Sequence, residues 1–418
     1  MSYWPRWLAG TAVLCSIPVL CHGQDAVTEW SESQIIDRFL SLSPQARELR
    51  ARVSLAEAET RTRLVYPNPW VGYAREGAGY NAFFEVSQTV PLARRMRYLR
   101  DAAGAIVSVA EANRVAALWS LRSDLRRAFF RMVASQERVR LLSDSAREVE
   151  QLITILRQRE SEGEGSRYDR VRAERELTEV RLDMTTAQSF VAADGARLAG
   201  YLPEGTQVRQ VRGGLQVLPE VPELKDLMRR AMNVRSDYLA ERRSVERYQI
   251  EEQAARRLRI PEPQVTAGLK RAEDFQTVGA NPLSKAVVSG LAFSVTVPLP
   301  VFNNGRYEVA RYQAEQEQAS ARIAVLARQI RAEIEGARDV FTMRREALAS
   351  YQRELESAGL ELTRITQTAY QEGEVGILEL LDSLRVNRAA HLRLLDLQAA
   401  VKEAFVELER VIGEEVRP

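Results

Sequence analysis

Few side chains of this sequence are placed to do chemistry, and the clearest are two carboxylates, Glu379 and Asp382. They stand three residues apart in a segment with helical periodicity, so both lie on one face of a helix. Such a pair attracts cations, but on its own it is most simply an ordinary solvated helix surface. The sequence has no phosphate-binding loop, nucleophile elbow or metal-protease motif, so we expect no enzyme activity.

Metal-ligating residues are equally scarce. Of two histidines and two cysteines, only His391 lies outside the N-terminal leader described next. A lone histidine on an apolar stripe is more often a packed side chain than a ligand, and no cluster of His or Cys is available. We therefore expect neither a metal site nor a cofactor.

The first 23 residues have the pattern of a signal peptide. Arg6 precedes an apolar run from Leu8 to Leu20, and small residues follow that suit cleavage after residue 23. Lipidation would modify Cys21, but Leu20 is too bulky for the usual lipobox, so we expect cleavage without acylation. Beyond the leader no run of about eighteen apolar residues follows, so any further membrane insertion must use strands.

The composition argues against a nucleic-acid partner. The formal charge is +2, and basic and acidic residues are nearly balanced at 59 and 57. Four arginines do cluster near the middle of the first half, and a solvated helix face is their simplest interpretation. They are Arg94, Arg95, Arg97 and Arg100.

The chain after the leader is a tandem repeat. A Pro-x-Pro pair followed by Val-Pro-Leu occurs at 67–69 and 90–92, and again about 200 residues later at 261–263 and 297–299. We predict a first repeat over 24–203, a linker over 204–222 and a second repeat over 223–418. Each repeat is expected to contain a helix, a β-hairpin, a long helix and a return helix.

The long helices follow from apolar residues that recur every seven positions. At about 1.5 Å per residue, roughly 70 residues form a rod of about 100 Å, which needs other helices to pack against. Gly-containing breakers at 162–166 and 372–376 end the rods. Helices near 31–64 and 223–259 and the return helices each have half a rod's length, so two stacked end to end match one rod. These recurring apolar residues include Leu125, Met132, Leu142, Val149 and Leu156 in the first long segment, and Ile334, Phe341 and Leu348 in the second.

The β-hairpins are predicted over about 69–91 and about 263–298. In the last strand Leu291, Phe293 and Val295 alternate with small or polar residues, as in the wall of a membrane barrel. Strands this short would also fit a half-buried sheet. Four strands cannot close a barrel, so insertion requires several copies, and more than about eight strands are needed for a lumen.

These features together resemble the TolC-like outer-membrane efflux family, and the resemblance covers essentially everything after the leader. It rests on the tandem repeat, the strand openings at 66–69 and 260–263, the junction at 297–306 and the segment from Tyr370 to Asp382. The implied fold is mainly α with transmembrane β. It is a homotrimer with a twelve-stranded barrel in the lipid of the outer membrane and a long α-helical barrel in the periplasm.

The resemblance also implies a function. The chain would be the passive exit duct of a tripartite efflux pump, joined by a periplasmic adaptor to an inner-membrane pump of the RND type. The junction at 297–306 is most similar to the heavy-metal cation branch of the family. The resemblance does not distinguish an efflux duct from the exit duct of a type I protein-secretion system, which has the same architecture.

Gate residues are likewise implied by the resemblance. Glu379 and Asp382 match an acidic ring, which in a trimer would place six carboxylates around a narrow pore. Tyr370 and Asp169 match a hydrogen bond that closes the entrance, whereas Val375 stands where relatives often have a second, basic lock residue. The glycines of the breakers are expected at helix tips that face the adaptor: Gly163, Gly165, Gly373 and Gly376.

One alternative belongs to a different class of protein. A periplasmic coiled-coil adaptor or scaffold would never enter the membrane, and it normally has one helical hairpin with β-domains of the lipoyl type. This chain has two predicted helical hairpins and short strands, which favours the duct.

Overall fold

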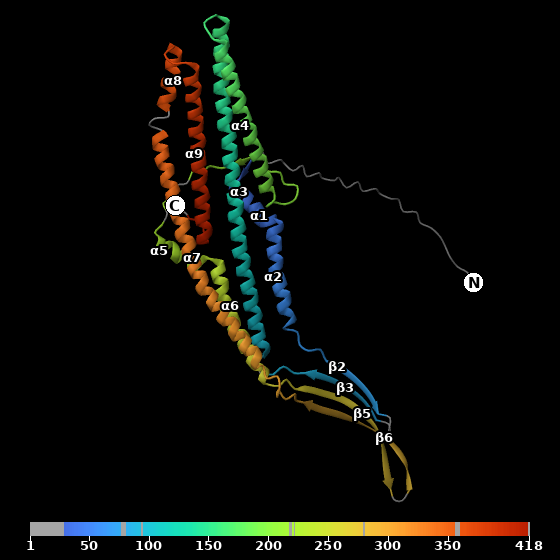
Figure 1. The fold of residues 1–418 in the computed structure, drawn as a ribbon. Coiled ribbons are helices and arrows are strands. Elements are labelled where there is room, and N and C mark those ends of the chain that lie inside the picture. The colour runs from blue at the N-terminus through green and yellow to red at the C-terminus, as the bar shows by residue number, and fades with distance from the viewer. Residues whose placement is uncertain are drawn as a thin grey trace, which may run out of the picture.

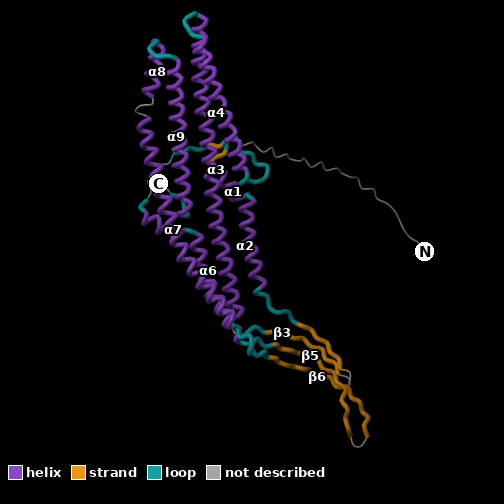
Figure 2. The backbone as a smooth tube through the Cα atoms, in the orientation of Figure 1, coloured by secondary structure: helices purple, strands orange, loops and turns teal. Residues whose placement is uncertain are grey.

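The computed structural model describes residues 29–76, 81–92, 95–216, 220, 222–278, 281–355 and 360–416. The predicted signal peptide, with Cys21, lies outside these residues. The described chain is a long bundle of helices with a sheet at one end (Figures 1 and 2). Among the described helices, none is both long and apolar enough to cross a membrane.

The same order of elements occurs in both halves of the chain. The first half contains β1 (Trp30–Ser31), α1 (Glu32–Leu42), α2 (Pro44–Thr62), β2 (Trp70–Glu76), β3 (Asn81–Thr89), α3 (Arg95–Ser161) and α4 (Arg167–Ala199). The second contains β4 (Val211–Arg212), α5 (Leu224–Val234), α6 (Ser236–Arg256), the 3-10 turn η1 (Arg257–Arg259), β5 (Gln264–Val278), β6 (Asn281–Thr296), α7 (Arg306–Glu354), α8 (Leu360–Glu372) and α9 (Ile377–Ile412).

The helix before each hairpin is broken, so the single helices predicted near 31–64 and 223–259 are wrong in this respect. Ser43 is extended (ψ 139°) because Pro44 disfavours the helical conformation in the preceding residue, and the Ser43 hydroxyl then caps α2. Arg235 is extended as well (ψ 114°) between α5 and α6. Its guanidinium donates to the carbonyl oxygen of Val411 (3.1 Å) at the end of α9.

The first long helix is confirmed as one unbroken element of 67 residues. Its predicted heptad rows are buried, including Leu125, Met132 and Val149. The second long helix was predicted as one rod, but the structure describes it as α7 and α8, and residues 356–359 between them lie outside the described part.

The described helices lie side by side along the bundle. Near the tips α3 lies between α4 and α9, and α9 also contacts α7 and α8. Nearer the sheet α3 contacts α2 and α6, and α6 contacts α7. The predicted stacking of half-length helices is therefore confirmed, since α2 and α4 share α3 while α6 and α9 share α7. One edge of the bundle is formed by α2 and α4, and the other by α7 and α8 (Figure 1).

The hairpins combine into one antiparallel sheet in the order β2-β3-β5-β6. The contact between β3 and β5 joins the two repeats and runs from Thr89–Gln264 to Asn81–Ala272. Within the described residues β2 and β6 pair on one side only, so both outer edges of the sheet are open.

The register collects the apolar side chains on one face. Phe84 on β3 lies opposite Leu269 on β5, which in turn lies opposite Leu291 on β6. On the other face Ser87 and Thr266 hydrogen-bond across the strands (2.7 Å), and Ser294 lies next in that row. The apolar face is uncovered: Leu291 is 90% exposed and Phe293 72%. Among the described residues no helix packs on either face of this sheet.

An ion-pair ladder fixes α3 against α9. Arg127 binds Glu407 (2.5 Å), Arg131 lies opposite Glu403 (3.7 Å), and Arg138 pairs with Asp396. From one pair to the next, the arginine lies four and then seven residues further along α3, and its partner lies four and then seven residues earlier on α9. This is the spacing expected of antiparallel helices that pack with a heptad period.

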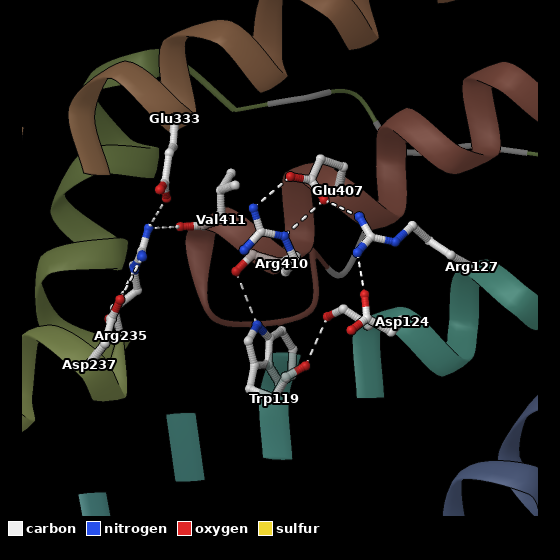
Figure 3. A network of polar contacts seen from close by, with 10 residues as sticks. Trp119, Asp124, Arg127, Arg235, Asp237, Glu333, Glu407, Arg410 and Val411 are labelled. Atoms are coloured by element: carbon white, nitrogen blue, oxygen red, sulfur yellow. Dashed lines mark hydrogen bonds and ion pairs between the residues drawn. The ribbon is translucent and has the colours of Figure 1, made fainter. Parts of the chain in front are cut away.

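The ladder continues into a polar network at the C-terminal end of α9 (Figure 3). Glu407 accepts hydrogen bonds from both Arg127 and Arg410, and the indole of Trp119 donates to the carbonyl oxygen of Arg410 (3.1 Å). On the far side Arg235 binds Glu333 of α7 (2.6 Å). The network therefore holds α3, α6, α7 and α9 together.

The buried rung of this ladder joins Arg126 to Glu409, and Arg126 also binds Glu32 of α1 (2.5 Å). Burial raises the pKa of Glu409, and the charge of Arg126 opposes this shift without cancelling it. We expect Arg126→Leu to lower the free energy of unfolding by about 3–5 kcal/mol, because it leaves a buried carboxylate without its partner. Guanidinium chloride unfolding followed by helical circular dichroism measures this loss.

The matched control is Arg131→Leu on the same helix. The Arg131 and Glu403 side chains are 52% and 50% exposed, so their pair should contribute less than about 1 kcal/mol. Equal losses in the two variants would contradict the difference between buried and exposed rungs.

Candidate functional site

The two helical tips lie together at the end of the bundle opposite the sheet (Figure 1). They have the same backbone geometry. Gly163 (φ 81°) and Gly373 (φ 80°) adopt the left-handed conformation that favours glycine. The next amide in each turn donates to a carbonyl oxygen five residues earlier, from Glu164 to Arg159 and from Glu374 to Ala369. Gly165 lies in the first turn, and Gly376 precedes α9. The predicted tip residues thus form two matching turns.

Tyr370 lies just below the second tip and is half-buried against an apolar cluster shared by α3, α4 and α9. Burial raises the pKa of Tyr370, and the negative charge of Asp169 on α4 raises it further. A hydrogen bond from Arg159 of α3 acts in the opposite direction. The charge of Asp169 thus acts on the Tyr370 phenol, as expected if the predicted pair lie near each other at the tips. Arg159, which sequence reasoning missed, acts on the same phenol.

Glu379 and Asp382 lie in the first turns of α9, and both are exposed. Carboxylates at a helix N-terminus are stabilised by the helix dipole, so these positions suit them without any partner. Within the described protomer neither forms an ion pair, although the charge of Asp382 helps to raise the pKa of nearby Arg385. They remain available to solvent or to ions in solution.

A buried carboxylate that sequence reasoning missed holds the two repeats together below the tips. The side chain of Glu176 on α4 is only 1% exposed and accepts hydrogen bonds from Arg385 (2.6 Å) and Arg388 (3.1 Å) on α9. Burial raises the pKa of Glu176, but the hydrogen bonds and charges of the two arginines outweigh it, and the net pKa is lowered. A sequence signal existed, because Glu176 interrupts the apolar stripe of Ala173, Leu177 and Val180.

The described residues contain no group of three or more side chains suited to a metal ion. His391 is half-buried on α9, and its Nδ1 lies 2.9 Å from the carbonyl oxygen of Asn387 in the preceding turn. A half-buried imidazole needs a hydrogen-bonding partner, and His391 has one within its own helix.

Comparison with known proteins identifies the fold. No family model matches the chain. The cobalt-zinc-cadmium resistance protein CzcC of Cupriavidus metallidurans is 25% identical over 307 residues, which are 71% of this chain and 70% of CzcC. The transmembrane channel protein CusC superposes with a TM-score of 0.70 over 92% of both chains, at 18% identity.

The open state of the MtrE outer-membrane channel of Neisseria gonorrhoeae gives a TM-score of 0.67 over 92% of this chain and 89% of MtrE, again at 18% identity. The chain has the outer-membrane channel fold. The predicted TolC-like architecture, mostly helical with a few strands, is thereby confirmed. In this channel fold the two tips and the sheet are opposite ends of one elongated protomer.

The Glu176 ion pairs generate a prediction with a defined pH dependence. Glu176→Gln should lower the free energy of unfolding by about 2–3 kcal/mol at pH 7, because two charged hydrogen bonds lose their acceptor charge. A lowered folded-state pKa means that this stabilisation is fully present above the ordinary glutamate pKa of about 4.3 and is lost as the pH falls through the lowered value.

The difference between wild type and Glu176→Gln should therefore be constant from about pH 7 to 5 and shrink below about pH 4, as measured by denaturant unfolding at each pH. Glu150→Gln is the control, since Glu150 pairs with Arg181 at an exposed site within one helical hairpin. A difference that persists undiminished at about pH 2 would contradict the assignment to the Glu176 charge.

Proposed function

We propose that this protein is the outer-membrane exit duct of a tripartite efflux system, which conducts substrates passively from the periplasm to the outside. The observation that carries the proposal is the sheet: one face is apolar and exposed, and both edges are open. In water such a face costs free energy, whereas against lipid it is the outer wall of a barrel.

The open edges support assembly from several copies. Every unpaired backbone group in hydrocarbon costs several kcal/mol, so β2 of one protomer must pair with β6 of the next. Two copies would make an eight-stranded barrel filled by side chains, whereas three would make twelve strands around a lumen. We therefore propose a homotrimer, as the TolC-like resemblance implies.

The helical edges support the same closure. Apolar side chains are exposed on α4, at one edge of the bundle, and on α7, at the other. In a closed ring the α2–α4 edge of each protomer would meet the α7–α8 edge of its neighbour, directly above the β2–β6 contact. The residues are Val171, Leu182 and Phe190 on α4, and Val325, Val340 and Met343 on α7.

The tips are the proposed entrance. In a trimer Glu379 and Asp382 would form a ring of carboxylates, and Tyr370 with Asp169 and Arg159 would hold the helix pairs in the closed state. The Gly163 and Gly373 turns would face the periplasmic adaptor, which connects the duct to an inner-membrane pump of the RND type. Glu176 with its two arginines would support the closed arrangement from below.

The proposed cargo is a heavy-metal cation. The support is the similarity to CzcC, a cobalt-zinc-cadmium resistance protein, over 71% of this chain. A duct needs no ligand cluster for such ions, because it has to pass them and not retain them.

Membrane insertion through the apolar face is tested by Leu291→Arg. An arginine on the lipid side near the middle of the membrane costs about 2–4 kcal/mol, so less protein should reach the outer membrane as a heat-modifiable trimer. Ser294→Arg, on the opposite face of the same strand, is the control and should insert like the wild type. A wild-type chain that fractionates as a soluble periplasmic monomer would refute the duct and favour a scaffold.

The acidic ring is tested by the double variant Glu379→Ala and Asp382→Ala in planar bilayers. We expect weaker block by divalent cations and lower cation selectivity, because six negative charges leave the entrance. Exchanging the two residues, with Glu379→Asp and Asp382→Glu, keeps the charges and should preserve the block. Unchanged conductance and block in the alanine variant would show that the ring lies elsewhere.

A further inference from the structure

Arginines are concentrated where the helical bundle meets the sheet. Four segments come together there, at 61–69, 90–92 with 95–100, 256–263 and 297–307 (Figure 1). These described residues include nine arginines, no lysine and one carboxylate, although the whole chain is nearly balanced in charge. The concentration is therefore a property of this level of the molecule. We call these segments the basic collar.

Contacts join the segments at 95–100 and 256–263 and tie the segment at 61–69 to the neighbouring part of α6. Arg95 at the start of α3 binds Glu262 (2.9 Å), the one carboxylate of the collar, and Arg257 donates to the hydroxyl of Tyr98 (3.2 Å). Arg63 at the end of α2 reaches Glu251 of α6 (3.2 Å). These pairs bring the first and second repeats together at one height.

Several collar arginines have no protein partner among the described residues. These side chains are exposed, and the part of the chain that the structure describes provides neither an ion pair nor a hydrogen bond for them: Arg61, Arg97, Arg100 and Arg259. Glu59 and Asp101, next to the collar in sequence, are exposed, whereas Glu251 and Glu252 of α6 pair with the other collar arginines Arg63 and Arg256. The collar thus has uncompensated positive charge available to an anionic surface.

Large apolar and aromatic side chains are exposed at the same level. Phe302 is 95% exposed and Leu299 78%, in the loop that leads from β6 into α7. Tyr66 and Trp70 are exposed at the entrance to β2, and Tyr307 at the start of α7. Aromatic rings with a polar edge favour the boundary between lipid headgroups and acyl chains.

Basic and aromatic groups side by side match a membrane interface that carries negative charge. A soluble acidic protein would suit the arginines but not Phe302, and a purely apolar contact would leave the arginines unpaired. The collar also adjoins the apolar face of the sheet, whose odd-numbered residues on β6 lead directly towards Leu299 and Val301. A lipid that covered the apolar face of the sheet would therefore also reach the collar.

We propose that the basic collar binds the headgroups of anionic phospholipids in the periplasmic leaflet of the membrane that surrounds the barrel. The inference rests on the proposed function, because the sheet must be in the membrane for the collar to meet this leaflet. Arginines would bind lipid phosphates, and Phe302, Leu299 and Trp70 would anchor the same level in the interface.

The test uses the full-length trimer, purified in detergent and titrated with phosphatidylglycerol or phosphatidylcholine. Native mass spectrometry counts the lipids bound. We expect the wild type to prefer phosphatidylglycerol, and the triple variant Arg97→Gln, Arg100→Gln and Arg259→Gln to lose at least tenfold of that preference. An arginine near a charged membrane surface contributes roughly fivefold in affinity.

Two control variants separate charge from structure. The lysine version, Arg97→Lys, Arg100→Lys and Arg259→Lys, keeps the charge and should retain most of the preference. Removing three exposed arginines near the tips, with Arg167→Gln, Arg172→Gln and Arg175→Gln, should leave it unchanged. Salt should weaken the preference of the wild type, and millimolar inorganic phosphate should not, since a lipid surface and not a free-phosphate site is bound.

Other results would refute lipid binding by the basic collar and leave the proposed function as an exit duct unaffected. If the glutamine variant changes ion selectivity in bilayers but not lipid preference, these arginines line the pore. If it loses the trimer, they lie between protomers, and competition by inorganic phosphate would indicate a soluble anion site. Failure of the wild type to insert or to form a trimer would refute the proposed function itself.

Discussion

The antiparallel contact between α3 and α9 is the interaction on which the rest of the protomer depends. It joins the two repeats along the bundle, as β3 and β5 join them in the sheet. The lower part of the contact is an ion-pair ladder with a buried rung at Arg126 and Glu409. Above Asp396 the ladder ends, and α9 is held instead through Glu176 of α4. The tips are thus attached by fewer charged contacts than the middle of the bundle.

Most of the fold could be predicted because its signals are local and repeated. The heptad pattern predicts the long helix α3, the alternation of apolar and polar residues predicts the strands, and the glycines predict the turns at the tips. The helix breaks were harder. Pro44 is a local signal for the first break that the sequence analysis did not use, whereas the break at Arg235 has no local signal. That break depends on partners about 100 and 180 residues away, on α7 and α9.

The site was predictable only in part, for a related reason. Tyr370 and Asp169 came from a family resemblance, and the residues themselves do not indicate that they meet. Arg159 and Glu176 act through pairs between different helices, and Glu176 is about 200 residues from Arg385 and Arg388. Single-sequence patterns report which face of a helix is apolar, but not which charged residue of another helix that face will meet.

The two hairpins differ in length, and this difference would limit the depth of the proposed barrel. Among the described residues, β5 pairs with β6 alone beyond Ala272, and the proposed ring would close only along the seven residues of β2, its shortest strand. Seven tilted residues span roughly 18 Å, which is less than the apolar band of about 25 Å expected of an outer-membrane barrel. Above that height the rim would consist of three separate β5–β6 projections with gaps between them. The cell exterior would then encounter one repeated hairpin and not a smooth cylinder.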